Sequence, residues 1–376
     1  LVKGPLQSIE ADVVIDKSVT IESVDHTKQD LVLYWGGGSS SAQKILIKNL
    51  TMGLPLTLRR LNIELVPYSG ASSNDIGIRS DPSLFGEVRM EDVDVRWTDM
   101  QSGSPYTNNP GKMVDLTMDG WVWLRRCNFI ALDHRPDYAA ATGQRYGTDA
   151  LIVRAMSLVM EDCKVRGGSA GFGKFATSMQ FPFGGDGGFA LKANTFWTLL
   201  VRSSFSDGNG SFLEAGAWQT TPKPGKAKLS QFTGPHGYLG AYDSTHERGR
   251  DGAVVKSYTP TRGSSAQLGD PEAPLTVAGS AVLGKSIDIE IARSSKTPVA
   301  LVFGCEWWLS KFGSIGDLWL NPRKPLITLP VNGPGKMSFG VPNNIYLIDL
   351  PFLGQVITNS TAGFKLGNPS GIAIRK

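Results

Sequence analysis

The sequence has little of what marks membrane-spanning, disulfide-rich or helical proteins. No apolar run approaches the roughly 18–20 residues that a membrane span needs, so we expect no membrane span. The 376 residues include three cysteines, which fit neither a zinc cluster nor a disulfide scaffold. Charged residues make up 19% of the chain, and no amphipathic pattern runs longer than about ten residues, which argues against a helical protein.

Signs of nucleic-acid binding and of common catalytic motifs are also few. The net charge is +4, and the Lys and Arg residues are scattered, so no nucleic-acid partner is expected. There is no HExxH metal motif and no phosphate-binding loop, and we predict no resident metal ion. The chain begins at Leu1 without a signal-peptide pattern, from which we expect a processed or incompletely represented amino terminus.

Glycine and proline, in contrast, are abundant, with 44 and 22 residues, as is typical of a turn-rich β protein. The chain also repeats one pattern. The order is an apolar residue, any residue, an apolar residue, two polar residues, a small or apolar residue, any residue and a further apolar residue. Five segments carry it: LTLRRLNIEL (56–65), VRMEDVDVRW (88–97), VWLRRCNFIA (122–131), LVMEDCKVRG (158–167) and TLLVRSSFSD (198–207).

The repeat predicts coils of short strands that are separated by corners. Two polar residues between inward-facing ones break the period of two of a β-strand, which marks a corner between two strands. A further short strand precedes the corner, as in VDLTM (114–118) and FALKA (189–193). Repeated in parallel, such coils stack with equivalent residues about 4.7–4.9 Å apart. The sequence therefore predicts a parallel β-helix.

Charges at the predicted corners alternate in sign from one coil to the next. The pairs are Arg59-Arg60, Glu91-Asp92, Arg125-Arg126, Glu161-Asp162 and Val201-Arg202. Alternating charges attract across each step of the stack, whereas equal charges would repel. We interpret them as a solvent-exposed ladder that fixes register and contributes ~0.2–1 kcal/mol for each pair. An acidic–basic binding stripe is the alternative interpretation.

Cys127 and Cys163 occupy equivalent positions on neighbouring coils, in a column that also holds Val93 and Ser203. Their expected spacing lies within the range that a disulfide allows. Two buried thiols in an inner column of compact side chains are the other interpretation, and we favour it.

Two segments near the amino terminus suggest a family. LVKGPLQSIEADVVIDKSVTIES (1–23) and KILIKNLTMGLPLTLRRLNI (44–63) resemble the first coils of secreted bacterial right-handed parallel β-helix proteins of the pectate-lyase-like class. The resemblance covers residues 1–265 and lies in the coil pattern, which many activities share. It implies a right-handed β-helix and an extracellular or cell-surface location.

The pattern changes after GDPEAP (269–274). Segments of alternating apolar and polar residues follow, about 8–15 residues apart, with Gly, Pro and Asn between them. They predict a small antiparallel β-sandwich at residues 266–376, similar to domains appended to secreted bacterial β-helices. We expect the pair Trp307-Trp308 to place one ring in the sandwich core and one outside it. The predicted fold class is therefore all-β, a right-handed parallel β-helix followed by a small antiparallel β-sandwich.

Insertions at equivalent places in the coils are the first candidate site for chemistry. They comprise residues 66–74, 98–112, 131–147 and 168–187, and on a solenoid they would form a wall along one flank. A lyase removes a proton beside a uronate carboxylate with Arg, Lys, His or Tyr. The catalytic candidates of these types are His134, Arg135, Tyr138, Arg145 and Lys174. A packed polar loop is the alternative interpretation, and we favour it.

Two glycine-rich stretches resemble calcium loops. FGGDGGFA (183–190) and SDGNGS (206–211) offer Asp and Asn at ligand spacing, but both lack the closing carboxylate. We therefore predict no cofactor and interpret both stretches as tight turns, with calcium as the alternative.

Trp121 and Trp123 are the candidate binding residues. If Val122 and Leu124 point inward, both indoles point outward, where they can stack on a sugar ring or on another protein. A loop lying over them is the alternative.

Two functions fit these observations. The first is a non-enzymatic extracellular structural or adhesive protein, which associates with itself in a filament, with a cell surface or matrix, or with carbohydrate. The second is a polysaccharide lyase or hydrolase that acts in the groove beside the insertions. The sequence favours the first, and it leaves the question of enzymatic activity open.

Overall fold

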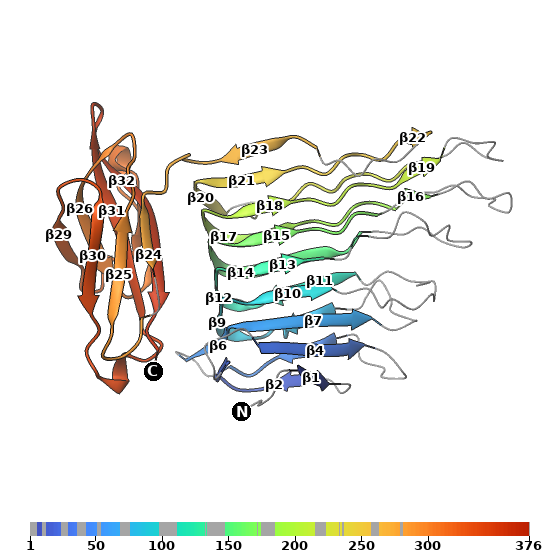
Figure 1. Cartoon of the computed structure of the whole chain (residues 1–376), viewed down its shortest axis with the longest axis horizontal. Helices are drawn as coiled ribbons and strands as arrows, with labels where there is room; N and C mark the ends of the chain where they lie inside the picture. Colours follow the sequence, from blue (N-terminus) through green and yellow to red (C-terminus); the bar gives the residue numbers. More distant parts are fainter. Residues whose placement is uncertain are drawn as a thin grey trace. The chain divides into compact units, whose positions relative to one another are not determined.

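The computed structural model describes residues 6–9, 13–23, 29–35, 43–50, 54–67, 76–97, 111–131, 133, 147–170, 172–173, 185–214, 223–232, 234, 237–256, 263–278 and 281–375. The chain forms two compact units. One comprises Leu1–Gly240 and Thr245–Gln267, and the other comprises Ala241–Ser244 and Leu268–Lys376. Strands dominate both units among the described residues (Figure 1).

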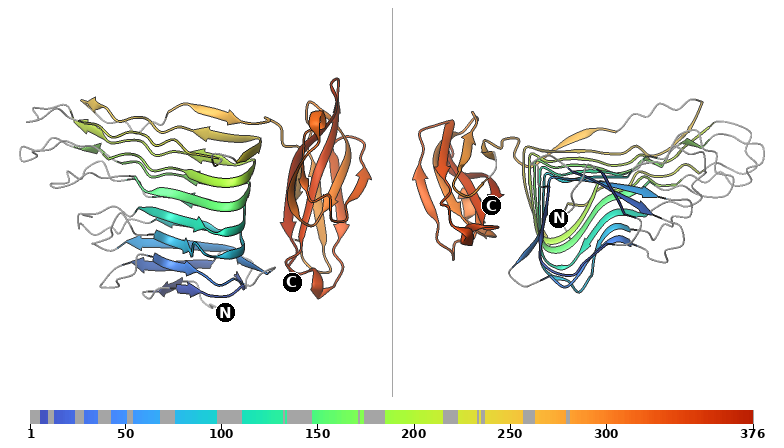
Figure 2. Two further views of the ribbon diagram at one scale, coloured as in Figure 1. Left: turned by 180° about the vertical axis from the view of Figure 1, so that it is seen from behind. Right: turned by 60° about the horizontal axis from the view of Figure 1, so that its bottom comes forward.

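The first unit is a parallel β-helix, as predicted. Its nine-stranded sheet, the corner-following sheet, contains in spatial order β1 (Leu6–Ile9), β4 (Gln29–Trp35), β7 (Leu61–Pro67), β10 (Asp94–Trp97), β13 (Asn128–Ile130), β15 (Lys164–Arg166), β18 (Ser204–Ser206), β21 (Ser244–Glu247) and β23 (Ser265–Leu268). Neighbouring strands of this sheet pair in parallel, with Phe129 opposite Val165 and Val165 opposite Phe205. Figure 2 shows the stack from behind and with its lower end turned forward.

An eleven-stranded sheet supplies the rest of most coils. It contains β2 (Val13–Ile15), β3 (Thr20–Glu22), β5 (Gln43–Ile47), β6 (Pro55–Arg59), β8 (Ile76–Ser80), β9 (Phe85–Glu91), β11 (Lys112–Thr117), β12 (Asp119–Arg125), β14 (Asp149–Glu161), β17 (Leu191–Val201) and β20 (Tyr238–Tyr242). The first part of β14 pairs with β11 and its last part pairs with β12, so this long strand joins two rows of shorter ones. A small sheet of β16 (Phe172–Gly173), β19 (Phe212–Glu214) and β22 (Val254–Val255) completes the unit among the described residues.

The predicted corners are present, and each one turns on a single residue in the left-handed region. These residues have φ between 45° and 56°, and they are Arg60, Asp92, Arg126, Asp162, Arg202 and Asp243. Each lies between a strand of the eleven-stranded sheet and a strand of the corner-following sheet. A left-handed residue reverses the curvature of the chain locally, which explains how the two polar residues of the repeat produce a bend.

The alternating charges are largely buried, which corrects the prediction of a solvent-exposed ladder. The column before each left-handed residue contains Arg59, Glu91, Arg125 and Glu161, and each of these is at most 8% exposed. Opposite charges therefore meet across the stack where water screens them little. Arg59 Nε lies 3.1 Å from Glu91 Oε2, and Arg125 Nη1 lies 2.9 Å from Glu91 Oε1.

The left-handed arginines reinforce this column. Arg126 donates to both carboxylate oxygens of Asp92, at 2.6 and 2.7 Å, and to Glu91 at 3.0 Å. Two coils further, Arg202 repeats the arrangement with Asp162 and Glu161. Each carboxylate thus has at least one guanidinium partner. We call the charge ladder the set Arg59, Glu91, Asp92, Arg125, Arg126, Glu161, Asp162 and Arg202.

The column after the corner consists of compact buried residues, as predicted. Leu61, Val93, Cys127, Cys163 and Ser203 are each at most 8% exposed. Cys127 and Cys163 are free thiols, so the structure has the two buried thiols rather than the disulfide. Burial raises the pKa of the Cys163 thiol well above its usual value.

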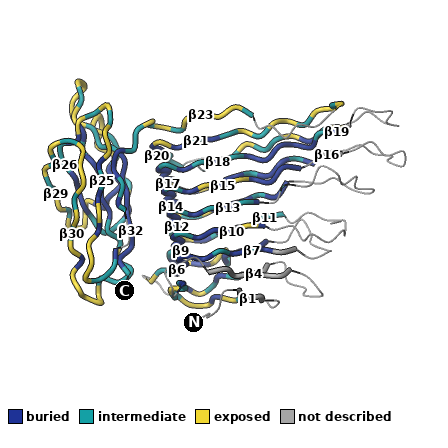
Figure 3. The backbone as a smooth tube through the Cα atoms, in the orientation of Figure 1, coloured by how far each residue is buried: buried dark blue, intermediate teal, exposed yellow. Residues whose placement is uncertain are grey.

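The inner apolar columns of the eleven-stranded sheet form the main core of this unit. Val88, Val122 and Leu158 are in register, as are Met90, Leu124 and Met160, and all six are at most 1% exposed. Figure 3 shows the corresponding strands as buried. Equivalent residues of successive coils therefore pack on one another, which is the reason the repeat is visible in the sequence.

In the later coils, the segment that follows the corner-following strand forms backbone hydrogen bonds with the segment that begins the coil. We call this contact, made by residues 147–149, 167–170, 185–190 and 207–211, the glycine seam. The Gly168 amide donates to the Thr148 carbonyl (2.9 Å), the Gly188 amide to the Gly168 carbonyl (2.8 Å) and the Gly208 amide to the Gly188 carbonyl (3.0 Å). A Cβ on Gly188 would lie 2.1 Å from the Thr148 carbonyl oxygen, so no side chain fits.

The seam corrects the interpretation of the two glycine-rich stretches as tight turns. Residues 185–189 and 207–211 lie in segments without a turn, and their glycines are outside the left-handed region. Glycine is required at these positions because two backbones approach closely, not because the chain reverses.

The second unit consists of antiparallel sheets, as predicted. The smaller layer holds β24 (Leu275–Ala278), β25 (Ser286–Ile291) and β30 (Gly335–Gly340), and the larger holds β29 (Ile327–Pro330), β26 (Thr297–Gly304), β31 (Pro351–Ser360) and β32 (Gly363–Ala373). A hairpin of β27 (Trp307–Lys311) and β28 (Asp317–Leu320) accompanies them, with short 3₁₀ turns η1 (Gly313–Ile315) and η2 (Ile345–Leu347).

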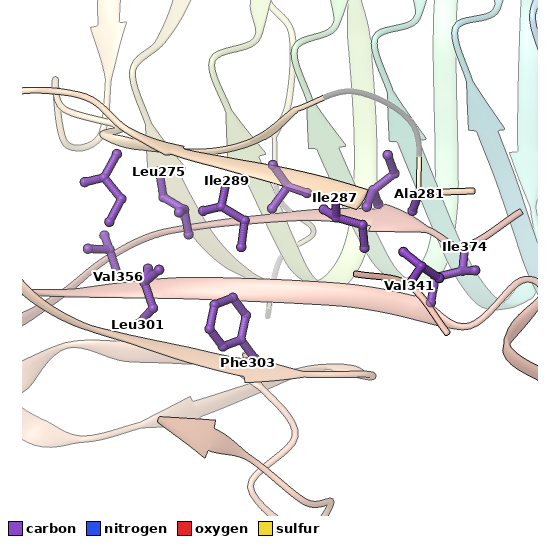
Figure 4. Packing of buried hydrophobic residues seen from close by; sticks show 12 residues of the cluster. Leu275, Ala281, Ile287, Ile289, Leu301, Phe303, Val341, Val356 and Ile374 are labelled. Atoms are coloured by element: carbon purple, nitrogen blue, oxygen red, sulfur yellow. The ribbon is translucent and has the colours of Figure 1, made fainter. Parts of the chain in front are cut away.

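Alternating apolar residues of the two layers form the sandwich core. Figure 4 shows Leu275 and Ile289 facing Leu301, Phe303 and Val356. Each of these residues is at most 6% exposed. Trp307 is 8% exposed and Trp308 is 42% exposed, which confirms that the pair splits between the inside and the outside.

Candidate binding surface on the β-helix

The candidate catalytic residues from the insertions lie outside the described residues. They are His134, Arg135, Tyr138, Arg145 and Lys174. Asp133 belongs to the insertion 131–147. Its carboxylate accepts a hydrogen bond from the Ser169 amide at 2.8 Å and forms an ion pair with Arg166. The lyase hypothesis that rests on these insertions therefore stays a prediction.

Asp207 and Asn209, the potential calcium ligands, bind protein groups in this structure. Asp207 is fully buried and accepts hydrogen bonds from the amides of Ala190 and Ser230 and from the Ser230 hydroxyl. Asn209 Oδ1 accepts from the Arg250 amide at 2.8 Å. No three His, Cys, Asp or Glu side chains gather to hold a metal ion within the described part of the chain.

Asp207 also contacts the one histidine with a described environment. His246 Nε2 lies 2.7 Å from Asp207 Oδ2, and its ring packs edge-on against Phe232 at 5.0 Å. Burial alone would raise the pKa of Asp207, but the hydrogen bonds from His246, Ala190 and Ser230 outweigh it and lower that pKa. The Ser230 hydroxyl donates to Asp207, not to the imidazole, so the geometry is that of a buried structural bridge rather than a serine nucleophile activated by histidine.

Residues 167–171 read GGSAG, which matches the G-x-S-x-G motif of serine hydrolases. In those enzymes the serine lies on a sharp turn between a strand and a helix. Here Ser169 lies in the glycine seam, 8% exposed, and its Oγ accepts a hydrogen bond from the Asn209 amide at 3.2 Å. The motif therefore reflects the requirements of the seam.

The structure separates the two predicted binding tryptophans. Trp123 is 4% exposed, and the Arg89 guanidinium lies 5.6 Å from the centre of its ring. Trp123 is therefore unable to stack on a ligand, which corrects the prediction. Trp121 is half-buried, and its ring meets the edge of Phe85 at 6.4 Å with an interplanar angle of 76°.

Two neighbouring strands place aromatic and acidic side chains alternately around Trp121. Phe85 pairs with Asp119, and Glu87 pairs with Trp121. Both strands begin with an exposed residue, a buried glycine and a half-buried residue, so the four side chains share the outer face. We call Phe85, Glu87, Asp119 and Trp121 the aromatic–acid patch.

The patch rests on a fixed base. Arg89 donates to both oxygens of Glu87, at 2.6 and 2.9 Å, while its guanidinium lies over buried Trp123. This bidentate contact holds the Glu87 carboxylate in one orientation and neutralises it. Asp119 is exposed and forms no ion pair with any described residue.

Exposed apolar side chains also lie on the neighbouring coils, one position before the column of Trp121. Leu54 precedes β6 on one side, and Met156 and Phe196 lie at adjacent positions of β14 and β17 on the other, with exposures of 57%, 37% and 68%. Half-buried Trp197 is in the column of Trp121, with Ser157 between them. We call Leu54, Phe85, Trp121, Met156, Phe196 and Trp197 the apolar stripe.

The stripe provides at least one partly exposed apolar side chain on each of five coils, from β6 to β17. At the spacing of parallel strands it extends about 19 Å along the stack. Large exposed apolar surfaces on a rigid element commonly mark contact with a ligand or partner. The arrangement can bind an extended molecule by stacking, and it offers carboxylates for hydrogen bonding.

The sequence contained a signal for this patch that the search for catalytic motifs missed. FGEV (85–88) and DGWV (119–122) share an x-Gly-x-Val pattern in which the aromatic and acidic residues exchange places. The pattern becomes informative only once the two segments are known to be side by side.

Within the described part of the chain, no helix has the length and apolar character to span a membrane. Comparisons of the chain with protein-family models, with curated proteins and with solved structures found no match.

Proposed function

We propose that the protein is an extracellular structural or adhesive β-helix, of the pectate-lyase-like class in its coil pattern, that holds a polysaccharide along the apolar stripe. The supporting observation is the succession of partly exposed apolar side chains on five stacked coils. Sugar rings have apolar faces that stack on indole and phenyl rings, and their hydroxyls bond to carboxylates such as Glu87.

The rigidity of the stripe supports this ligand class. Except for Leu54, its residues project from paired strands rather than from loops, and Glu87 is fixed by Arg89. Binding to a preorganised surface costs little ordering of the protein, which favours a long ligand that makes one weak contact on each coil.

The test is calorimetric titration of the protein with a panel of neutral and charged polysaccharides. Wild type is compared with Trp121→Ala and Phe196→Ala, and Trp308→Ala is the matched control, since it removes a partly exposed tryptophan of the other unit. We expect the stripe variants to weaken binding about tenfold and the control to leave it unchanged. Equal binding by all four proteins would contradict the proposal.

The same samples separate adhesion from the other hypotheses. Glycan chains that shorten during incubation, followed by size-exclusion chromatography, would favour the lyase or hydrolase. Self-association that Trp121→Ala abolishes, followed by light scattering, would assign the stripe to an interface between copies of the chain and contradict its role in glycan binding.

A further inference from the structure

The aromatic–acid patch carries a charge that the rest of the apolar stripe lacks. Glu87 is neutralised by Arg89, but Asp119 forms no ion pair with any described residue. The exposed Arg154 on the next coil pairs in register with Thr117 and forms no ion pair with Asp119. The patch therefore combines two aromatic rings with one negative charge that no described residue neutralises.

Aromatic rings and carboxylates together favour one ligand chemistry. The faces of indole and phenyl rings attract organic cations, and a nearby carboxylate adds a charge-assisted hydrogen bond. Neutral sugars offer the Asp119 carboxylate only hydrogen bonds from hydroxyls, whereas a protonated amine also pairs with its charge, and uronates are repelled by it. The ligand group that fits both features is a protonated amine.

A second observation at the edge of the patch concerns a buried hydroxyl. Ser157 follows Glu87 and Trp121 in the same column and is fully buried. Its hydroxyl has no hydrogen-bond partner within the described part of the chain. A buried hydroxyl without a partner costs free energy, and a polar ligand group that displaced a flanking indole and reached the hydroxyl would remove that cost.

We infer that the aromatic–acid patch recognises the protonated amino groups of a glycan that contains hexosamines without their N-acetyl groups. This inference rests on the proposed function, because it names the class of polysaccharide that the apolar stripe holds. Phe85 and Trp121 contact the amine and the apolar ring faces, Asp119 supplies the counter-charge, and Glu87 accepts hydrogen bonds from hydroxyls.

The test uses two matched probes, oligosaccharides of glucosamine and the same oligosaccharides fully N-acetylated, in a mildly acidic buffer that protonates the amines. Titration of the wild type is expected to give about two- to fivefold tighter binding of the amine form. Added salt is expected to reduce this preference, because the ion pair is at the surface.

Two carboxylate variants locate the effect. Asp119→Asn is expected to abolish the preference for the amine form, because the counter-charge is lost. Asp16→Asn makes the same charge change at the exposed residue that follows β2, and it is expected to retain the preference. Both changes are at the surface, so circular dichroism should show wild-type folding in both.

The outcomes separate the inference from the proposed function. Equal affinity for the two probes, or a preference that survives Asp119→Asn, would overturn the inference and leave glycan binding by the stripe standing. Absence of binding to both probes and to every polysaccharide of the panel would overturn the inference together with the proposed function.

Discussion

The two units of this chain achieve order in different ways. In the β-helix, each residue contacts its equivalents on the neighbouring coils, so charges, thiols and glycines form columns. In the sandwich, residues of two antiparallel layers interdigitate, and its core is a cluster of aliphatic side chains and phenylalanine. A column repeats any chemical choice along the stack, whereas a sandwich core asks mainly for apolar volume.

This difference explains why polar groups lie inside the first unit. A buried arginine is tolerated there because a carboxylate occupies the same position one coil away. The sandwich instead keeps ion pairs such as Lys336–Glu290 at its surface, where the two side chains are 77% and 47% exposed. Changes of equal chemistry should therefore have unequal effects in the two units.

The largest difference is expected for charge reversal. Arg125→Glu places three carboxylates in succession in the charge ladder, at a site that is 3% exposed, and should destabilise the β-helix by about 3–5 kcal/mol. Lys336→Glu, the same change in the sandwich, should leave stability unchanged within measurement error. The check is the urea midpoint of each variant, and similar midpoints for the two variants would contradict a buried ladder.

Adding one methyl group should separate the units next. In Gly188→Ala the new Cβ would meet the Thr148 carbonyl at 2.1 Å, and we expect a loss of about 1–3 kcal/mol. Gly335→Ala is the control, because nothing lies within 4 Å of its Cβ position. Thermal unfolding of both proteins tests this, and an unchanged Gly188→Ala protein would show that the seam can open.

Buried hydrogen-bonding bridges should differ in their response to pH. Asp207 in the β-helix has a pKa lowered by its hydrogen bonds, so its contribution is complete above its unfolded pKa of about 3.9 and is lost as the pH falls through the folded value. Asp207→Asn should cost about 1–3 kcal/mol at neutral pH, and its stability should converge on that of wild type in acid.

The sandwich provides the neutral counterpart. Gln355 is fully buried, accepts from the Trp319 amide and donates to the carbonyls of Asp317 and Gly367. An amide does not titrate, so Gln355→Ala should lower stability by the same amount in acid and at neutral pH. Urea unfolding at a series of pH values measures both bridges, and parallel curves for Asp207→Asn and wild type would refute the role of the Asp207 charge.

The smallest difference between the two units is expected in the reactivity of their cysteine thiols. Burial raises the pKa of Cys163 and thus keeps it as an unreactive thiol, while Cys305 of the sandwich is partly exposed. Iodoacetamide should therefore label Cys305 first, with Cys127 and Cys163 protected until the protein unfolds. Mass spectrometry of digests would show the order, and early labelling of Cys163 would contradict the buried column.

The repeat was sufficient to predict the β-helix, because charged residues recur at the same place in successive coils. It could not predict that Arg59, Glu91 and Arg125 are buried, since the same alternation suits an exposed ladder and a paired interior one. Only the structure shows that Glu91 forms ion pairs with the arginines of both neighbouring coils, which allows all three side chains to be buried.

The proposed binding surface was less accessible to sequence reasoning. Trp121 was predicted to face outward and is half-buried, but Trp123, also predicted to face outward, is 4% exposed beneath Arg89, which lies on a different coil. Phe85 and Asp119 are 34 positions apart and attract attention only when their strands are paired. The catalytic candidates such as Arg135 and Tyr138 stay predictions, since they fall outside the described residues.

The most direct test of glycan binding by the apolar stripe is hydroxyl-radical footprinting with and without the polysaccharide that binds best. The account predicts that Phe85, Trp121, Met156 and Phe196 become protected together, while Trp308 of the sandwich keeps its reactivity. Protection elsewhere, with unchanged oxidation of the stripe, would contradict it.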